Sequence, residues 1–315
     1  MLKGFIDNNA RRIPLDRIRE GNFGYMKEVV LSMAAKEIEW RDQPGDVHVT
    51  ELVRPTRITI LDRRYGYYLD PMSMVDLWEG NVAHAELSRH NGLLREHTIM
   101  KNIHGANVVG KIDIYNEGVL RDFKWTKIFT YKKCVENIRD NNSEYHWQIN
   151  IYRWLLEQEG YKVTEQQLIL RLKDWSATTW RSTDPPAPIM KVDVPFAEDV
   201  EKYLFDRVEA YLLFKGQTDD ALPMCTDAER YGRDKEGNWK RCKFYCNGHP
   251  FCEAIANNEQ FNWQKGYDAC KKQAENIDGI LLQNFNVDDA STLPFRFQWL
   301  EVFSWLKNNP QRRTK

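Results

Sequence analysis

The stretch GANVVGKIDIYNEGVLRDFKWT, residues 105–126, decides what kind of sheet this chain can build. Its two halves, residues 107–115 and 119–126, alternate apolar and polar side chains, which is the pattern of β-strands. The connector Asn116-Glu117-Gly118 is short and contains asparagine and glycine, which is a hairpin signal. We therefore expect two paired antiparallel strands joined by a tight turn.

The same stretch imitates a phosphate-binding loop, because Gly105 is followed by four residues and then by Gly110-Lys111. Such a loop needs serine or threonine after the lysine, a strand before it and a helix after it. Here Ile112 follows the lysine, and the next residues alternate as a strand. Both requirements fail, so the pattern argues against an ATPase of this kind.

Two carboxylates and a lysine stand out in the predicted hairpin. Side chains alternate faces along a strand, so Lys111 shares a face with Asp113, and Asp122 shares a face with Lys124. In a paired hairpin, Asp113, Asp122 and Lys124 converge. Carboxylates bind hard divalent cations, and a lysine beside them orients or helps to deprotonate an attacking water and offsets phosphoryl charge. The alternative is an exposed hairpin with ordinary surface charges.

Composition limits the classes of function. The chain has 315 residues, 45 basic and 46 acidic, with a net charge of -1, so any basic surface that binds nucleic acid must be local. No apolar run reaches the roughly eighteen residues of a transmembrane helix, and the first residues lack the apolar core of a signal peptide. We expect a cytoplasmic protein with no membrane partner.

The pattern along the chain suggests four segments. Helices are predicted over residues 26–40, 75–94, 143–160 and 198–214, and a further strand over residues 161–172. The segments are an N-terminal extension (1–46), a mixed helix-and-strand core (47–215), a cysteine-rich metal-binding segment (216–256) and a helical C-terminal extension (257–315).

Two further motifs flank the hairpin. Gly80-Asn-Val-Ala-His84 places a histidine on a predicted helix. Gln148 and Tyr152, four residues apart, lie on one face of another predicted helix. Each has an ordinary structural explanation, namely a satisfied histidine on a helix face and a partly buried amphipathic helix.

In this order, Gly-x3-His, Gly-x2-Asp, Asp-x-Lys and Gln-x3-Tyr resemble the motifs of the RecB-type branch of the PD-(D/E)XK nucleases. Residues 49–66 also look like the helical segment that often precedes the histidine in that family, and the resemblance spans about residues 49–172. It implies an α/β fold, with a mixed central β-sheet flanked by helices in a restriction-endonuclease-like core. The four motifs read Gly80…His84, Gly110…Asp113, Asp122…Lys124 and Gln148…Tyr152.

The resemblance also implies roles for single residues. Lys124 would be the catalytic lysine, and Gln148 and Tyr152 would position a DNA strand or support the site. Glu96 lies where such enzymes often place an acidic residue before the first central strand. The implied ligands of Mg²⁺ or Mn²⁺ are an imidazole, two carboxylates and a main-chain carbonyl: His84, Asp113, Asp122 and Phe123.

A metal-dependent DNA nuclease, acting as an exonuclease on single strands or duplex ends, is the function that this resemblance implies. The chain carries no helicase motif, so such an enzyme would act alone or with a separate helicase or recombination partner. Stand-alone enzymes of this kind often serve recombination, repair or defence in bacteria or phages, so we expect this protein in a bacterial or phage-infected cell. The alternative is a non-catalytic nucleic-acid-binding or scaffold protein stabilised by a metal site of four cysteines. A zinc hydrolase is disfavoured because no His-Glu-x-x-His motif occurs.

Four cysteines cluster with the spacing Cys-x16-Cys-x3-Cys-x5-Cys: Cys225, Cys242, Cys246 and Cys252. Four thiolates hold zinc or an iron–sulfur cluster. The run WKRCKFYCNGHPFC resembles the C-terminal cysteine cluster of CRISPR-associated RecB-like exonucleases, which implies a 4Fe-4S cluster, with Zn²⁺ as the alternative. Two features depart from that pattern, since residues 49–66 contain no cysteine and Cys-x3-Cys replaces Cys-x2-Cys. Buried thiols that bind no metal are the alternative, which is disfavoured because four clustered cysteines in an intracellular protein more often bind metal.

Basic and aromatic residues near the motifs are candidates for DNA contacts, although most such residues are solvated charges or core aromatics in other proteins. Basic side chains would contact phosphates, and aromatic rings would stack on unpaired bases. The basic candidates are Arg54, Arg57, Arg63, Arg64, Lys127, Lys132 and Lys133. The aromatic candidates are Tyr65, Tyr67, Tyr68 and Trp125.

Overall fold

A computed structural model describes the chain over residues 2–7, 11–19, 23, 27–41, 45–65, 67–69, 75–87, 94–139, 143–178, 181 and 185–246. The predicted helical extension at residues 257–315 and Cys252 lie outside the described residues. The chain divides into two compact units, each treated by itself below. The first comprises Met1–Gln43, Arg57–Val75 and Gln217–Lys315, and the second comprises Pro44–Thr56 and Asp76–Gly216. Residues 57–75, which the sequence analysis placed in the core segment, thus cluster with the first unit.

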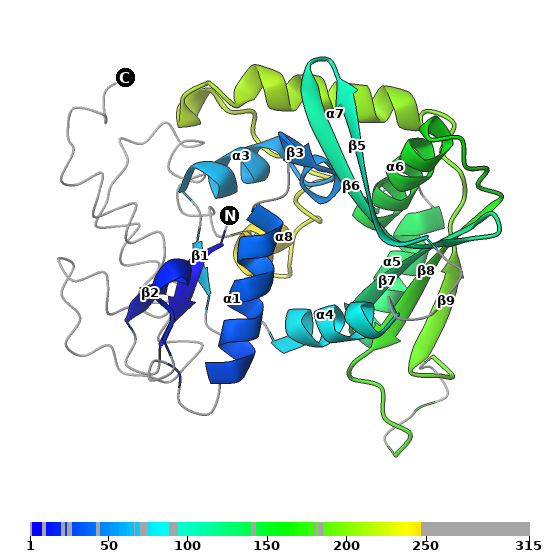
Figure 1. Ribbon diagram of the computed structural model, residues 1–315, viewed down its shortest axis with the longest axis horizontal. Coiled ribbons are helices and arrows are strands. Elements are labelled where there is room, and N and C mark those ends of the chain that lie inside the picture. The colour runs from blue at the N-terminus through cyan, green and yellow to red at the C-terminus, as the bar shows by residue number, and fades with distance from the viewer. Residues whose placement is uncertain are drawn as a thin grey trace. The chain divides into compact units, whose positions relative to one another are not determined.

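A mixed sheet forms the centre of the second unit (Figure 1). Its described strands are β3 (Val47–His48), β5 (Leu94–Ile103), β6 (Ala106–Asn116), β7 (Val119–Thr126), β8 (Glu165–Leu172) and β9 (Ile189–Asp193). β6 pairs antiparallel with β5 on one edge. On its other edge, β6 pairs with β7 through the hairpin and in parallel with β3 near its start. β7 and β8 are parallel, and β9 is antiparallel to β8.

The helices of this unit cover the sheet, which confirms the predicted α/β class with a mixed central sheet. They are α2 (Val49–Leu52), α4 (Val75–Leu87), α5 (Ile128–Arg139), α6 (Glu144–Gln158) and α7 (Val200–Phe214). α5 and α6 form the crossover that a parallel pair such as β7 and β8 requires. α6 packs on β6, β7 and β8, and α7 packs on α6. None of the described helices is long and apolar enough to span a membrane.

Several boundaries match the sequence analysis. β7 has the predicted bounds, and α6 begins after Ser143, whose hydroxyl accepts a hydrogen bond from the Tyr145 N–H at 3.2 Å. A serine in this position satisfies one of the unpaired main-chain donors of the first turn. The helix predicted over residues 75–94 is wrong at its end, because α4 ends at Leu87 and β5 already begins at Leu94. β5 and β9 were not predicted.

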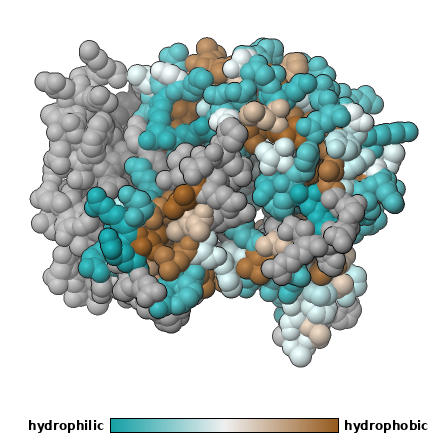
Figure 2. All heavy atoms as spheres, in the orientation of Figure 1, coloured by the Kyte–Doolittle hydropathy of each residue, from teal (hydrophilic) through white to brown (hydrophobic). Residues whose placement is uncertain are grey.

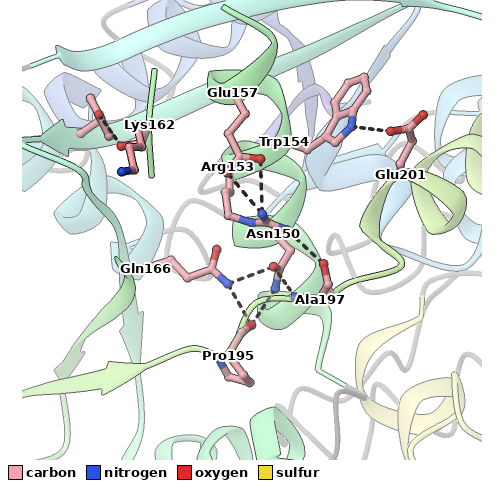
Figure 3. A network of polar contacts seen from close by, with 10 residues as sticks. Asn150, Arg153, Trp154, Glu157, Lys162, Gln166, Pro195, Ala197 and Glu201 are labelled. Atoms are coloured by element: carbon pink, nitrogen blue, oxygen red, sulfur yellow. Dashed lines mark hydrogen bonds and ion pairs between the residues drawn. The ribbon is translucent and has the colours of Figure 1, made fainter. Parts of the chain in front are cut away.

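Polar side chains fasten α6 to its surroundings (Figure 3). Asn150 and Gln166 connect the helix to β8 through a hydrogen bond of 3.0 Å. The Trp154 indole donates to Glu201 of α7 at 3.2 Å. Nearly every residue from His146 to Leu156 is buried, so the helix contacts other elements on several sides. The position of α6 is therefore fixed by both apolar packing and buried hydrogen bonds.

The first unit contains a smaller sheet whose described strands run in the order β2-β1-β4. Its elements are β1 (Leu2–Ile6), β2 (Arg12–Pro14), β4 (Tyr67–Leu69), α1 (Lys27–Arg41), α3 (Thr56–Tyr65), α8 (Lys240–Tyr245) and the 3₁₀ helices η1 (Leu15–Arg17) and η5 (Asp219–Ala221). Phe5 of β1 packs edge-on against Phe23, and both are buried. The N-terminal residues thus belong to a folded core. Figure 2 shows hydrophilic residues over much of the visible described surface, with smaller groups of hydrophobic ones between them.

Gly110 of β6 allows α6 to lie close to the sheet. A Cβ at this position would lie 2.6 Å from Leu155 Cδ1 and 3.3 Å from the Tyr152 ring, both of which belong to α6. The first distance is far below van der Waals contact, and Leu155 and Tyr152 are buried. The glycine of the Gly-x2-Asp motif therefore allows close packing of the helix on the sheet.

Replacing Gly110 with alanine is expected to lower the free energy of unfolding by about 1–3 kcal/mol, the usual cost of adding a group to a filled core. The matched control is Gly216→Ala, because Gly216 is exposed and a Cβ there meets nothing within 4 Å. Urea unfolding of both variants measures the difference. Equal stabilities for the two variants would mean that α6 does not lie against Gly110.

Candidate active site

The strands of the hairpin separate where their carboxylates lie. The ladder between β6 and β7 runs through the pairs Asn116–Val119, Tyr115–Leu120 and Ile114–Arg121. One step further, the Phe123 N–H donates to Asp113 Oδ2 at 2.7 Å. The Asp113 side chain thus takes the place of a main-chain acceptor for the Phe123 N–H. Nearer its start, at Val108 and Val109, β6 pairs with β3 instead of β7. The change of partner along β6 places Asp113 at the point of divergence.

Asp122 of β7 is the most enclosed charged group of the site, with 1% of its surface exposed. Its Oδ1 accepts a hydrogen bond from Gln148 Nε2 at 3.2 Å. Its Oδ2 forms an ion pair with Lys124 Nζ at 2.6 Å. Gln148 Nε2 also donates to the Tyr152 hydroxyl at 3.1 Å. The Gln-x3-Tyr motif of α6 therefore holds one oxygen of Asp122 and leaves the other toward the lysine.

Lys124 is held in its charged form. Burial alone lowers the pKa of the ammonium, but the carboxylates of Asp122 and Asp113 outweigh burial and raise the pKa above its usual value. The ion pair between Asp122 and Lys124 and the hydrogen bond from the intervening Phe123 N–H to Asp113 place the three predicted residues near one another. At neutral pH, Lys124 is therefore a cation that can orient groups and offset negative charge, and it is not a resting base.

Tyr145 is a residue of the site that the sequence analysis missed. Lys124 Nζ lies 5.5 Å from the centre of its ring, within the range of a cation–π contact. Burial raises the pKa of the Tyr145 hydroxyl, so it stays protonated. Tyr145, Gln148 and Tyr152 are spaced i, i+3 and i+7, which places them on one face of α6. This spacing puts Tyr145 on the face of the Gln-x3-Tyr motif, but only the position of Lys124 Nζ shows that Tyr145 belongs to the site.

The two carboxylates fit a hard divalent cation such as Mg²⁺ or Mn²⁺, which prefers oxygen ligands. A carboxylate oxygen has two lone pairs, so the buried Asp122 Oδ2 can face both Lys124 and a cation. Among the residues that the structure describes, no group of three or more His, Cys, Asp or Glu gathers closely enough to hold a metal ion. The third predicted side-chain ligand, His84, lies on α4, but its side chain is outside the described residues.

The remaining motif residues lie on neighbouring elements. Gly80 of α4 is buried, and a Cβ there would lie 3.6 Å from the Trp125 ring, so α4 packs beside the residue that follows Lys124. His84 follows Gly80 by about one helical turn. Glu96 lies on β5 in the left-handed region with φ of 46° and forms an ion pair with Lys111. Glu96 is therefore already engaged with a lysine of β6.

The residues predicted to contact DNA differ in their exposure and in their partners. The prediction is wrong for Arg57, which is 1% exposed and donates to the Leu222 carbonyl at 2.7 Å inside the first unit. Arg64 forms an ion pair with Asp219 of the same unit. Three basic candidates are exposed at or after the end of β7: Lys127, Lys132 and Lys133. Arg54, Arg63 and Trp125 are half-buried, and the side chains of Tyr65, Tyr67 and Tyr68 lie outside the described residues.

Three of the four clustered cysteines, Cys225, Cys242 and Cys246, are described and half-buried, so the four-cysteine site stays a prediction. Cys134 instead lies on α5 in the second unit and is buried. Burial raises the pKa of its thiol to about 12, a shift that a hydrogen bond with Ser143 opposes. Cys134 is therefore an inert, neutral thiol beside the start of α6.

His146 is fully buried in the first turns of α6. Burial lowers the pKa of its imidazole from the ordinary value of 6.5, although the charge of Asp199 opposes the shift. A histidine with a lowered pKa in the folded state contributes full stability above pH 6.5. That stability is lost as the pH falls, because the unfolded chain then binds a proton that the folded chain resists.

The stability of the wild type relative to His146→Gln is therefore expected to fall as the pH is lowered from 7.5 through 6.5 to 5.5. Urea unfolding of both proteins at these three pH values, at constant ionic strength, measures the difference. A difference in unfolding free energy that does not change with pH would show that His146 titrates as freely in the folded protein as in the unfolded chain.

Comparison with known proteins gives distant structural likenesses. No protein-family model matches the sequence, and no curated protein matches it. The solved structure of SSO0001 is 16% identical, with a TM-score of 0.44, covering 62% of this chain and 88% of that one. A phage-related exonuclease from Haemophilus somnus 129PT is 15% identical, with a TM-score of 0.36, covering 55% and 94%. The alkaline exonuclease LHK-Exo from Laribacter hongkongensis is 12% identical, with a TM-score of 0.35, covering 54% and 87%. Likenesses this low do not establish a function, so the assignment rests on the site.

Proposed function

We propose that this protein is a metal-dependent DNA nuclease of the PD-(D/E)XK type, from the RecB-type branch, that hydrolyses phosphodiester bonds. The observation that carries the proposal is the convergence of Asp113, Asp122 and a charged Lys124 at the point where β6 and β7 separate. The buried Asp122 carboxylate suits a cation, and the neighbouring Lys124 ammonium suits a phosphate.

Each residue has a task in this chemistry. Asp113 and Asp122 would hold Mg²⁺ or Mn²⁺, together with the Phe123 carbonyl and His84. When bound, the cation supplies a Lewis acid that polarises a phosphoryl oxygen. Lys124 offsets the negative charge that builds up on the phosphate during attack and orients the attacking water. Gln148, held by the Tyr152 hydroxyl, keeps the Asp122 carboxylate in a fixed orientation.

DNA is the proposed substrate, as single strands or duplex ends, with exonucleolytic cutting in recombination, repair or phage-related and defence processing. The exposed Lys127, Lys132 and Lys133 follow directly after β7 and would contact backbone phosphates. A separate helicase or recombination partner would supply unwound strands. The proposed setting is the cytoplasm of a bacterial or phage-infected cell.

The cysteine-rich segment is proposed to hold a structural 4Fe-4S cluster, with Zn²⁺ as the alternative. The proposal rests on the four clustered cysteines, Cys225, Cys242, Cys246 and Cys252. Four thiolates at such spacings close a loop around one metal centre and stabilise the segment that contains them.

Digestion of end-labelled linear DNA and closed circular DNA, single- and double-stranded, with Mg²⁺ or Mn²⁺ tests the proposed function. We expect metal-dependent cutting by the wild type and a loss of about 10²–10³-fold or more in Lys124→Ala, since the variant lacks the group that offsets developing charge. Lys202→Ala is the matched control, because Lys202 is an exposed lysine of α7 paired with Asp206, and it should cut like the wild type.

Loss of linear but not circular DNA would identify an exonuclease. If folded wild-type protein cuts nothing, the non-catalytic nucleic-acid-binding or scaffold protein becomes the better account. If Lys124→Ala cuts as fast as the wild type, the site is wrongly placed.

A further inference from the structure

Asn150 of α6 is fully buried and forms hydrogen bonds with both ends of its amide (Figure 3). Its Oδ1 accepts from Gln166 Nε2 at 3.0 Å and from the Ala197 N–H at 2.8 Å. Its Nδ2 donates to the His146 carbonyl at 2.9 Å and to the Pro195 carbonyl at 3.2 Å. Main-chain groups define which end donates and which accepts, so the orientation of the amide is settled by its partners.

These bonds join three elements at one buried point. Asn150 belongs to α6, Gln166 to β8, and Pro195 and Ala197 to the connection between β9 and α7. Gln166 Nε2 donates to the Pro195 carbonyl as well, at 2.9 Å. These hydrogen bonds therefore attach α6 both to strand β8 of the sheet and to the connection between β9 and α7.

Arg153 provides a second attachment one helical turn further on. Its Nη2 donates to the Ala197 carbonyl at 3.0 Å, and its guanidinium lies 4.6 Å from the centre of the Phe196 ring. An ion pair of 3.3 Å with Glu157 holds the guanidinium in place. Two attachments to one segment, on successive turns, restrict both rotation of α6 about its axis and sliding along it.

The attachments lie on the side of the helix away from the candidate active site. At about 100° per residue, Asn150 is about 200° round the axis from Gln148. A rotation of about 20° moves a side-chain tip, roughly 5 Å from the axis, by about 2 Å. The bond between Gln148 and Asp122 is already 3.2 Å long, so such a displacement would break it.

From this arrangement we infer that Asn150 is a positioning residue of the nuclease site, acting through Gln148 on the Asp122 carboxylate. The inference rests on the proposed nuclease function. A purely structural asparagine would affect stability alone, whereas a positioning residue affects turnover for as long as Gln148 is present to transmit the change.

The test is a double-mutant cycle with full-length protein on linear DNA at saturating Mg²⁺. Asn150→Asp keeps the shape but replaces two donated hydrogen bonds with repulsion between a carboxylate and two carbonyls. We expect kcat to fall by about 10–100-fold, the cost of a displacement of about 1 Å, with KM for DNA within about twofold. In a Gln148→Ala background the same change should lower kcat by less than about threefold, because the transmitting side chain is absent.

Two further variants make the outcome unambiguous. Gln166→Met removes hydrogen bonds from the same network at similar length and replaces Asn150→Asp in the cycle if that variant fails to fold. Val208→Ala removes buried methyl groups from α7 without removing any of these hydrogen bonds, and it reports the effect of lost stability alone.

The inference is overturned if the fold-losses in kcat of Asn150→Asp and Gln148→Ala multiply in the double variant. It is also overturned if Val208→Ala, with the same thermal midpoint as Asn150→Asp, loses as much kcat as Asn150→Asp does. In both cases the wild type still cuts DNA, so the proposed function stands. If the wild type cuts no DNA, the proposed function fails and the inference falls with it.

Discussion

The burial of the Asp122 carboxylate is the constraint on which the rest of the second unit depends. A charge that is 1% exposed is costly unless it is paired and hydrogen-bonded. Lys124 supplies the opposite charge from the same strand, and Gln148 supplies a hydrogen bond from α6. Both partners must therefore be brought to one spot, and the positions of β7 and α6 follow from that requirement.

The fold meets this requirement by packing α6 against Gly110 of β6 and by attaching the opposite side of the helix to the segment before α7. Gly110 removes the side chain that would separate helix and strand, since a Cβ there would overlap Leu155. On the far side, Asn150 and Arg153 attach the helix to the connection before α7. The contact with Gly110 sets the distance between α6 and the sheet, and the hydrogen bonds of Asn150 and Arg153 set the rotation of α6 about its axis. The hydrogen bond between Gln148 and Asp122 depends on both the distance and the rotation.

The local patterns of the sequence predicted the hairpin at the centre of the fold and the grouping of its two carboxylates with a lysine. Alternation over residues 107–126 was enough for the hairpin, and Ser143 marked the start of α6. The sequence allowed two carboxylates and a lysine to be grouped, namely Asp113, Asp122 and Lys124. Both the alternation of side chains along a strand and the tight turn between the strands are visible in a short stretch of sequence. Tyr145 was missed because its role depends on where Lys124 reaches, which periodicity along α6 alone does not reveal.

Long-range relations account for the other differences. Arg57 has the sequence character of a surface arginine, but a carbonyl far along the chain, that of Leu222, accepts from it in the interior. Strands β1, β2 and β4 of the first unit are short, and β1 pairs with β4 across a wide separation in sequence. No local alternation signals such a pairing. The roles of His84 and of the four-cysteine segment stay predictions.

Binding of Mn²⁺, followed by electron paramagnetic resonance of the free ion, tests most directly whether the diverging strands form a cation site. Mn²⁺ prefers oxygen ligands, so the cysteines should not compete for it. We predict saturable binding by the wild type and by Lys124→Ala, and at least about tenfold weaker binding by Asp122→Asn, which loses a charged ligand. The exposed control Asp206→Asn should bind like the wild type. Absence of Mn²⁺ binding in the wild type, or equal affinity in Asp122→Asn, would contradict the account.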